Sequence, residues 1–220
     1  MKEVFQKILD WSEVWAPLIP LIVFIYKKPT EKYLTPVVIY LAVAACLDLV
    51  IDVSWKYKPH MPLFLKDNNF LYNIHSISRL FLFILFFNAV AARTQIVHKL
   101  IPFFFLILIA INFIFFDNFR KFSDNLFTFE AIVLLVYAVL YFLRLMRSDE
   151  ANTDFDPSLV IITGIAIYEA INFFIFLFHE ALTKQNAVES ARIWNLVHNF
   201  SYIVFCLFIA RAFYGRFKHR

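Results

Sequence analysis

Seven apolar segments, separated by short polar connections, divide almost the whole chain. Each approaches the roughly 20 residues that an α-helix needs to cross the hydrocarbon core of a bilayer. None shows the alternation of apolar and polar residues that is typical of a membrane-barrel strand, so helices are predicted throughout. The predicted spans run from Ser12 to Tyr26, Leu34 to Trp55, Phe70 to Ala92, Leu100 to Phe116, Asn125 to Met146, Pro157 to His179, and Ala191 to Tyr214.

Composition supports the same conclusion. The chain is 61% hydrophobic and 17% charged, whereas soluble domains average roughly 45–50% apolar and 25% charged residues. A water-soluble fold of 220 residues could not bury that much apolar surface. We therefore predict an all-α integral membrane protein, a seven-transmembrane-helix bundle whose main partner is the lipid bilayer. It forms one multi-pass membrane domain, residues 1–220, in the cell (inner) membrane. The modest net charge of +4 is spread over loops, which argues against nucleic acid as a partner.

Orientation follows from Lys and Arg in the short connections, which favour the cytoplasmic side. The two sides differ little in basic residues. The basic tail at residues 216–220 favours an inner C-terminus, so the predicted topology is N-out/C-in. Five aromatic residues are then expected near the outer interface, where aromatic belts form: Trp11, Trp15, Trp55, Tyr57 and Trp194.

An internal repeat relates the first three predicted spans to the last three. Glu13 precedes Lys27, and Glu130 precedes Arg144, by the same fourteen positions. A proline opens the second span of each half and is followed twelve residues later by an acid, and the third span of each half carries a His-x-x-Ser pattern. The matching residues are Pro36 and Pro157, Asp48 and Glu169, and His75 and His198.

This pattern predicts a 3+1+3 parallel repeat, with residues 1–96 and 123–220 as two three-helix halves and residues 97–122 as a linker helix. Halves offset by four spans keep the same orientation in the membrane, as in transporters built from parallel repeats. Carriers of the PQ-loop type share this plan, but the Pro-Gln pair is absent because Val37 and Ser158 follow the two prolines. The last span also lacks the lysine that a retinal protein needs, and it has a single histidine where seven-helix zinc hydrolases have two.

Ionisable side chains inside a bilayer are costly and mark candidate functional sites. In the predicted topology they lie at similar depth in the outer half of the bundle, above an almost wholly apolar inner half. We expect them to line an outward-facing polar pocket between the halves. The predicted ligand-binding residues are Glu13, Asp48, Asp52, His75, Arg79, Glu130, Glu169, Asn172, Asn195, His198 and Asn199.

Three functions could use such a pocket. The leading interpretation is a transporter for a small polar solute or ion. The second is a membrane sensor or effector that signals through a partner protein. The third is a metal-dependent enzyme holding a divalent ion such as Zn, Fe or Mn, although no catalytic residue can be assigned. Its candidate metal ligands are Glu13, Asp48, His75, Glu130, Glu169 and His198, because four carboxylates and two imidazoles suit a carboxylate-bridged site. A homo-oligomer or a membrane partner is compatible with all three.

Overall fold

A computed structural model describes residues 2–90, 96–147 and 156–215 of the chain. All regular structure in these ranges is helical, and no strand occurs in them. Five helices are long and apolar enough to cross a membrane, which agrees with a multi-pass membrane protein. These five candidate spans are Lys32–Lys56, Asn69–Val90, Asp124–Arg147, Pro157–Gln185 and Val188–Tyr214.

The helices have the following bounds. The first segment contains α1 (Lys2–Asp10), α2 (Ser12–Trp15) and α3 (Leu18–Lys27), and the next contains the 3-10 turn η1 (Lys32–Leu34) and α4 (Thr35–Lys56). Then come η2 (Lys58–His60), α5 (Leu63–Lys66), α6 (Asn69–Val90) and α7 (Ile96–Ile111), which ends in the π-helical turn η3 (Asn112–Phe116). The last segments are α8 (Asp124–Arg147), α9 (Pro157–Gln185), α10 (Ala187–Ile193), the π-helical turn η4 (Trp194–His198) and α11 (Asn199–Tyr214).

Local chemistry explains where two of the long helices begin. Proline stands in the first turn of both α4 and α9, where its missing N–H costs nothing. In α9 the Asp156 side chain also accepts a hydrogen bond from the Ser158 backbone N–H, which satisfies a helix-end donor. Both helices therefore begin where the sequence predicted.

The prediction that the first span is one continuous helix is wrong. Instead of one helix from Ser12 to Tyr26, the chain breaks between α1 and α2 at Trp11 and again between α2 and α3 at Ala16 and Pro17. Pro17 and Pro20 cannot donate backbone hydrogen bonds. Between them, the Ile19 N–H bonds to the carbonyl of Ala16, three residues back instead of four.

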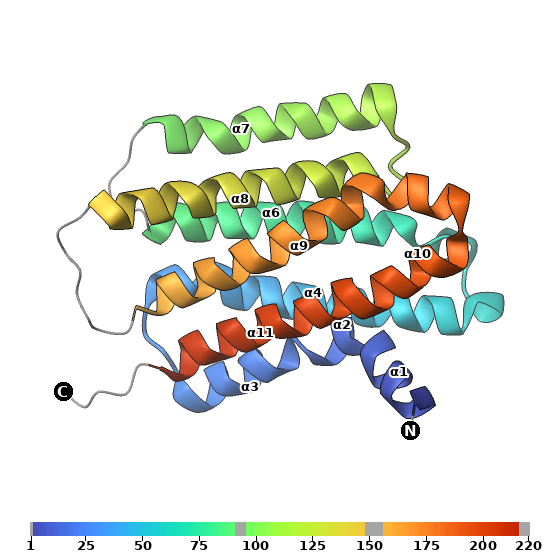
Figure 1. Cartoon of the computed structure of the whole chain (residues 1–220), viewed down its shortest axis with the longest axis horizontal. Helices are drawn as coiled ribbons and strands as arrows, with labels where there is room; N and C mark the ends of the chain where they lie inside the picture. The colour runs from blue at the N-terminus through green and yellow to red at the C-terminus, as the bar shows by residue number, and fades with distance from the viewer. Residues whose placement is uncertain (1, 91–95, 148–155, 216–220) are drawn as a thin grey trace.

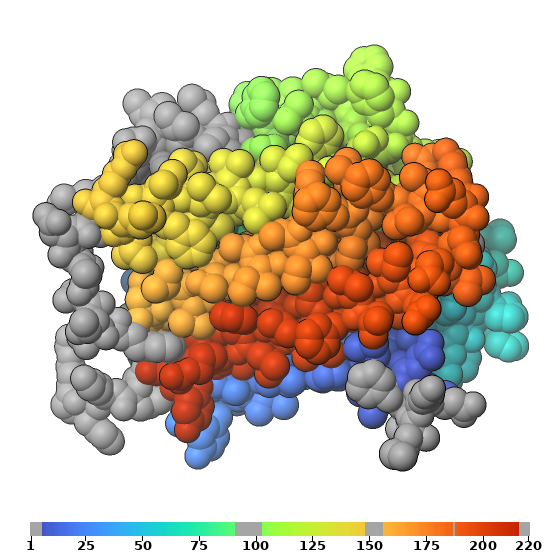
Figure 2. All heavy atoms as spheres, viewed as in Figure 1, coloured from blue at the N-terminus to red at the C-terminus, as the bar shows by residue number. Residues whose placement is uncertain are grey.

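Six helical segments pack in a closed ring. The order of neighbours is α2 and α3, α4, α6, α8, α9, α11, and back to α3. Figure 1 shows α8, α9, α11 and α3 in front, with α6 and α4 behind them. The fourth segment, α7, lies outside the ring beside α6 and α8 (Figure 1), and side chains such as Phe103 and Phe104 remain exposed on it. In Figure 2, α8, α9 and α11 pack side by side across this face.

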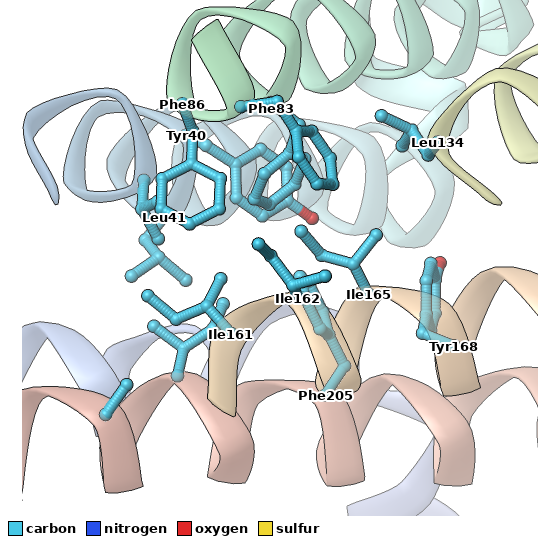
Figure 3. Packing of buried hydrophobic residues seen from close by; sticks show 14 of the residues in the cluster. Tyr40, Leu41, Phe83, Phe86, Leu134, Ile161, Ile162, Ile165, Tyr168 and Phe205 are labelled. Atoms are coloured by element: carbon cyan, nitrogen blue, oxygen red, sulfur yellow. The ribbon is translucent and has the colours of Figure 1, made fainter. Parts of the chain in front are cut away.

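The centre of the ring is filled by aromatic and branched side chains. Tyr40 and Phe83 have ring centroids 4.8 Å apart, Phe83 and Phe205 5.8 Å, and Tyr168 and Phe205 5.2 Å. Figure 3 shows Tyr40, Phe83 and Phe205 gathered around Ile162 of α9, with Tyr168 farther along the same helix. This apolar core closes the bundle beneath the polar residues.

One glycine permits a close approach of two helices. At Gly164 in α9, a Cβ would lie 2.7 Å from Cβ of Phe208 in α11. That distance is shorter than side chains tolerate, so α9 and α11 can approach each other this closely only because residue 164 lacks a side chain. The count of seven spans, the repeat and the N-out/C-in topology stay predictions. The tail at 216–220 and the end of the predicted third span lie outside the described residues.

Candidate functional site: a polar pocket above buried ionisable pairs

His198 joins the last helical segment to the first. It is the final residue of η4, and its side chain is only 5% exposed. Its Nδ1 lies 2.6 Å from Oδ1 of Asn172 in α9, and its Nε2 lies 2.9 Å from Oε1 of Glu13 in α2. The Trp194 ring stacks on the imidazole at a centroid distance of 4.5 Å.

The hydrogen bonds of Asn172 determine which nitrogen of His198 carries a proton. The Asn172 Nδ2 group donates to the Tyr168 carbonyl at 2.7 Å and to Oγ of Ser201 at 2.9 Å. A carbonyl can only accept, so Oδ1 of Asn172 faces His198 and accepts from Nδ1–H. The Nε2 atom and the Glu13 carboxyl must then share one proton between them, as an imidazolium beside a carboxylate or as two neutral groups.

A second group of buried side chains joins α6 to α8. Arg79 donates from Nε and Nη2 to the two carboxylate oxygens of Glu130, with the Nη2 bond at 2.8 Å. Oγ of Ser76 donates to the same carboxylate at 2.5 Å, and Arg79 Nη1 donates to the Tyr168 hydroxyl at 2.7 Å. Glu169 Oε1 lies 3.8 Å from Arg79 Nε. A bidentate guanidinium–carboxylate pair with further hydrogen bonds is the arrangement in which a buried ion pair is best compensated.

Asp48 and His75 form a third group between α4 and α6. His75 Nδ1 lies 3.2 Å from Asp48 Oδ1, and the Tyr40 ring stacks on the imidazole at 6.0 Å. Neither Asp48 oxygen nor His75 Nε2 has a well-aligned hydrogen-bond partner in the part of the chain that the structure describes. Buried polar atoms without partners cost free energy, so this group has capacity for a further ligand or a water.

A polar pocket of about 560 Å³ is lined by residues of α1, α2, α4, α6, η4 and α11, at the end of the bundle near the N-terminus (Figure 1). Glu13 is part of its lining, so the Glu13–His198 pair lies at the boundary between the pocket and the buried groups. The full lining is Asp10, Trp11, Glu13, Ile51, Asp52, Trp55, Lys56, Asn68, Asn69, Tyr72, Trp194, Asn195 and Asn199.

The eleven predicted site residues divide between the pocket and the groups below it. Four of them line the pocket: Glu13, Asp52, Asn195 and Asn199. The other seven lie in the three buried groups: Asp48, His75, Arg79, Glu130, Glu169, Asn172 and His198. The structure thus distributes the predicted residues over neighbouring groups instead of gathering six of them around one point.

The predicted metal ligands are correspondingly separated. Glu130 is engaged by Arg79 and Ser76, and Glu13 by His198. Among the described residues, no group of three or more His, Cys, Asp or Glu side chains is arranged to hold a metal ion.

Several pocket residues were missed by the sequence-based reasoning. Trp11, Trp55 and Trp194 were expected only in an aromatic belt, yet all three line the pocket, together with Asp10. The available signal was that they cluster near the same ends of the first, second, third and seventh predicted spans. That signal does not distinguish lipid-facing rings from rings that face one another. No protein-family model, curated protein or solved structure matches this chain.

Proposed function

We propose that this membrane protein binds a small polar solute in the pocket and carries it across the bilayer. The observation that carries the proposal is the position of the Glu13–His198 pair. It lies at the pocket wall, and it joins the first helical segment to the last, so a bound solute would contact the junction between the two predicted halves.

Interrupted helices at the pocket support a carrier. The first segment is broken on either side of α2, which carries Glu13, and the last contains the π-helical turn η4, which carries Trp194, Asn195 and His198. Substrate sites of secondary transporters are typically built from discontinuous membrane helices, and π-helical turns are frequent at functional sites.

The arrangement of the ring also supports two rocking halves. In the ring order, each helical segment of the first half lies opposite its predicted counterpart in the second half. The first segment of each half bonds to the third segment of the other half, through Glu13 to His198 and through Glu130 to Arg79. This equivalence is what a parallel repeat would produce, and the pocket would then lie at one of the two junctions.

The apolar centre argues against an open pore. Below the buried groups, Tyr40, Phe83 and Phe205 pack tightly together, whereas a pore needs polar lining along its whole length. Passage of a solute would therefore require the two halves to move relative to each other, as in alternating access. In the N-out topology, the pocket faces the outside in this conformation.

Uptake by proteoliposomes tests the carrier function. The full-length protein would be reconstituted and offered labelled amines, amino acids, sugars and inorganic ions. We expect saturable uptake of one class, abolished by Asp48→Asn and by Glu169→Gln. The control is Glu180→Gln, which alters an exposed carboxylate paired with Lys184. Uptake that is equal in all three variants contradicts the proposal, and saturable binding without uptake would point to a sensor.

A further inference from the structure

The pocket wall is rich in hydrogen-bond acceptors and poor in positively charged side chains. Carboxyl groups of Asp10, Glu13 and Asp52 come from three different helices, and Lys56 is the one lysine or arginine in the lining. The field in such a cleft attracts cations and repels anions. A ligand that carries positive charge therefore fits this pocket better than a carboxylate or a phosphate does.

Two acceptors of the pocket lack partners, and they point to a donor ligand independently of the net charge. Asn199 is only 3% exposed, and its Nδ2 already donates to the Leu9 carbonyl, so its Oδ1 atom is left as a buried acceptor without a partner among the described residues. Asp52 Oδ2 is likewise a buried acceptor without a partner among the described residues. Unpaired buried acceptors are costly, and an N–H donor or the positively polarised C–H groups of an ammonium would satisfy them.

Aromatic rings complete the wall. Trp11, Trp55, Tyr72 and Trp194 all line the pocket. Rings of this kind attract ammonium groups through their electron-rich faces, most strongly where water is excluded. The chain itself provides an example, because Nζ of Lys56 lies 5.5 Å from the centre of the Trp11 ring.

The proton between Glu13 and His198 can compensate the charge of such a ligand. Nδ1–H of His198 is committed to Asn172, so only the shared proton at Nε2 can leave. The charged and titratable groups around this pair come from four helices: Asp10 from α1, Asp48, Asp52 and Lys56 from α4, Tyr72, His75 and Arg79 from α6, and Tyr168 from α9. When an ammonium group pairs with the Glu13 carboxylate, the shared proton is released to water in the pocket, His198 becomes neutral, and the total charge is unchanged.

We propose that the pocket binds a small organic ammonium ion, held by Glu13 and the four aromatic rings, in exchange for the proton that Glu13 shares with His198. The transport step of this exchange rests on the proposed carrier function, whereas cation binding and proton release do not. One proton leaves for each cation bound, so cation binding strengthens as the pH rises.

Choline and its neutral isostere 3,3-dimethyl-1-butanol test the recognition step. Three of the four tryptophans line the pocket, so the fluorescence of the full-length protein in detergent would report occupancy. We expect saturable quenching by choline, with the isostere weaker by about tenfold or more, as expected from the loss of cation–π and ionic contacts. Equal affinity for the two compounds, or no saturable response to choline, overturns the proposal.

Proton release is measured with a pH indicator in weakly buffered solution. We expect about one proton per choline bound by the natural chain and by the Glu180→Gln control. The Glu13→Gln side chain has the same shape and can still form hydrogen bonds, but it has no proton to exchange. Proton release on choline binding should therefore vanish in this variant, and its choline affinity should become independent of pH. Asp52→Asn should weaken choline binding while the release persists. Proton release by the Glu13→Gln variant equal to that of the natural chain overturns the proposed proton exchange.

Choline counterflow in proteoliposomes separates this inference from the carrier function. Binding with proton release but no counterflow would end the carrier proposal and leave the organic-cation site standing. Uptake of a neutral or anionic solute that depends on Asp48, in a protein that does not bind choline, would end the organic-cation site and leave the carrier standing.

Discussion

Each of the two junctions between the predicted halves pairs a glutamate with a basic side chain, but the two pairs differ in geometry and in exposure. At one junction, Arg79 and Glu130 form a bidentate pair between regular, unbroken helices, and both side chains are at most 3% exposed. At the other, Glu13 and His198 are joined by a single hydrogen bond between two interrupted segments, and Glu13 is 18% exposed at the pocket. Multiple charge-assisted hydrogen bonds make the first junction rigid, whereas the second can exchange its proton and its partner.

This difference suggests that the Arg79–Glu130 junction holds the halves together while the Glu13–His198 junction responds to a ligand. The repeat would supply equivalent acids at both places, Glu13 and Glu130. The groups opposite those acids decide how each one behaves, because a guanidinium is a permanent cation whereas an imidazole can release its proton. Substitutions at the two junctions can break or sharpen the comparison.

The largest expected effect follows from Arg79→Met. It leaves Glu130 and Glu169 buried without their cation, and breaking a buried ion pair in this way costs about 3–5 kcal/mol of unfolding free energy. Reversible unfolding in mixed micelles would measure the loss. The double variant Arg79→Met with Glu130→Leu removes both charges, and it should recover much of the stability. A loss below about 1 kcal/mol in the single variant would show that the pair is not a rigid junction.

An intermediate effect is expected from substituting one serine at each junction. Ser76→Ala removes a hydrogen bond to the charged Glu130 carboxylate, which is worth about 1.5–3 kcal/mol. Ser201→Ala removes a bond to the neutral Asn172 amide, which is worth about 0.5–1.5 kcal/mol. The same unfolding assay compares the two variants. Equal losses, or a larger loss for Ser201→Ala, would remove the energetic distinction between the junctions.

The smallest effect on stability is expected from Glu13→Gln. The amide still reaches His198 Nε2 and the position borders the pocket, so the unfolding free energy should change by about 1 kcal/mol or less. Uptake into proteoliposomes should nevertheless be lost. A variant that unfolds as readily as Arg79→Met would mean that Glu13 is structural, and unimpaired uptake would mean that it is not part of the solute path.

Several features followed from sequence alone because they depend on local chemistry. Apolar length predicted the long helices, and the prolines at 36 and 157 predicted where two of them begin. The cost of ionisable groups in lipid singled out polar residues, and the structure places every one of them in the pocket or in the buried groups beneath it. No knowledge of packing was needed for these predictions.

Which of these side chains pair with one another could not be predicted in the same way. The sequence suggested one shared cluster, whereas Glu130 pairs with Arg79 and Ser76, and Glu13 pairs with His198 across almost the whole chain length. The position of a side chain along a helix gives its depth, but the rotation of that helix in the ring decides which neighbour it faces.

The sequence by itself determined that this chain is a helical membrane protein and which side chains are too polar to face lipid, because both depend only on composition and helical rise. Tertiary structure alone decided that three tryptophans and three carboxyl groups share one pocket, and that Glu130 pairs with Arg79 at one junction while Glu13 pairs with His198 at the other. The physical reason is that hydrogen bonds and ion pairs act over a few ångströms, and such distances between segments far apart in the chain are set only when the helices pack.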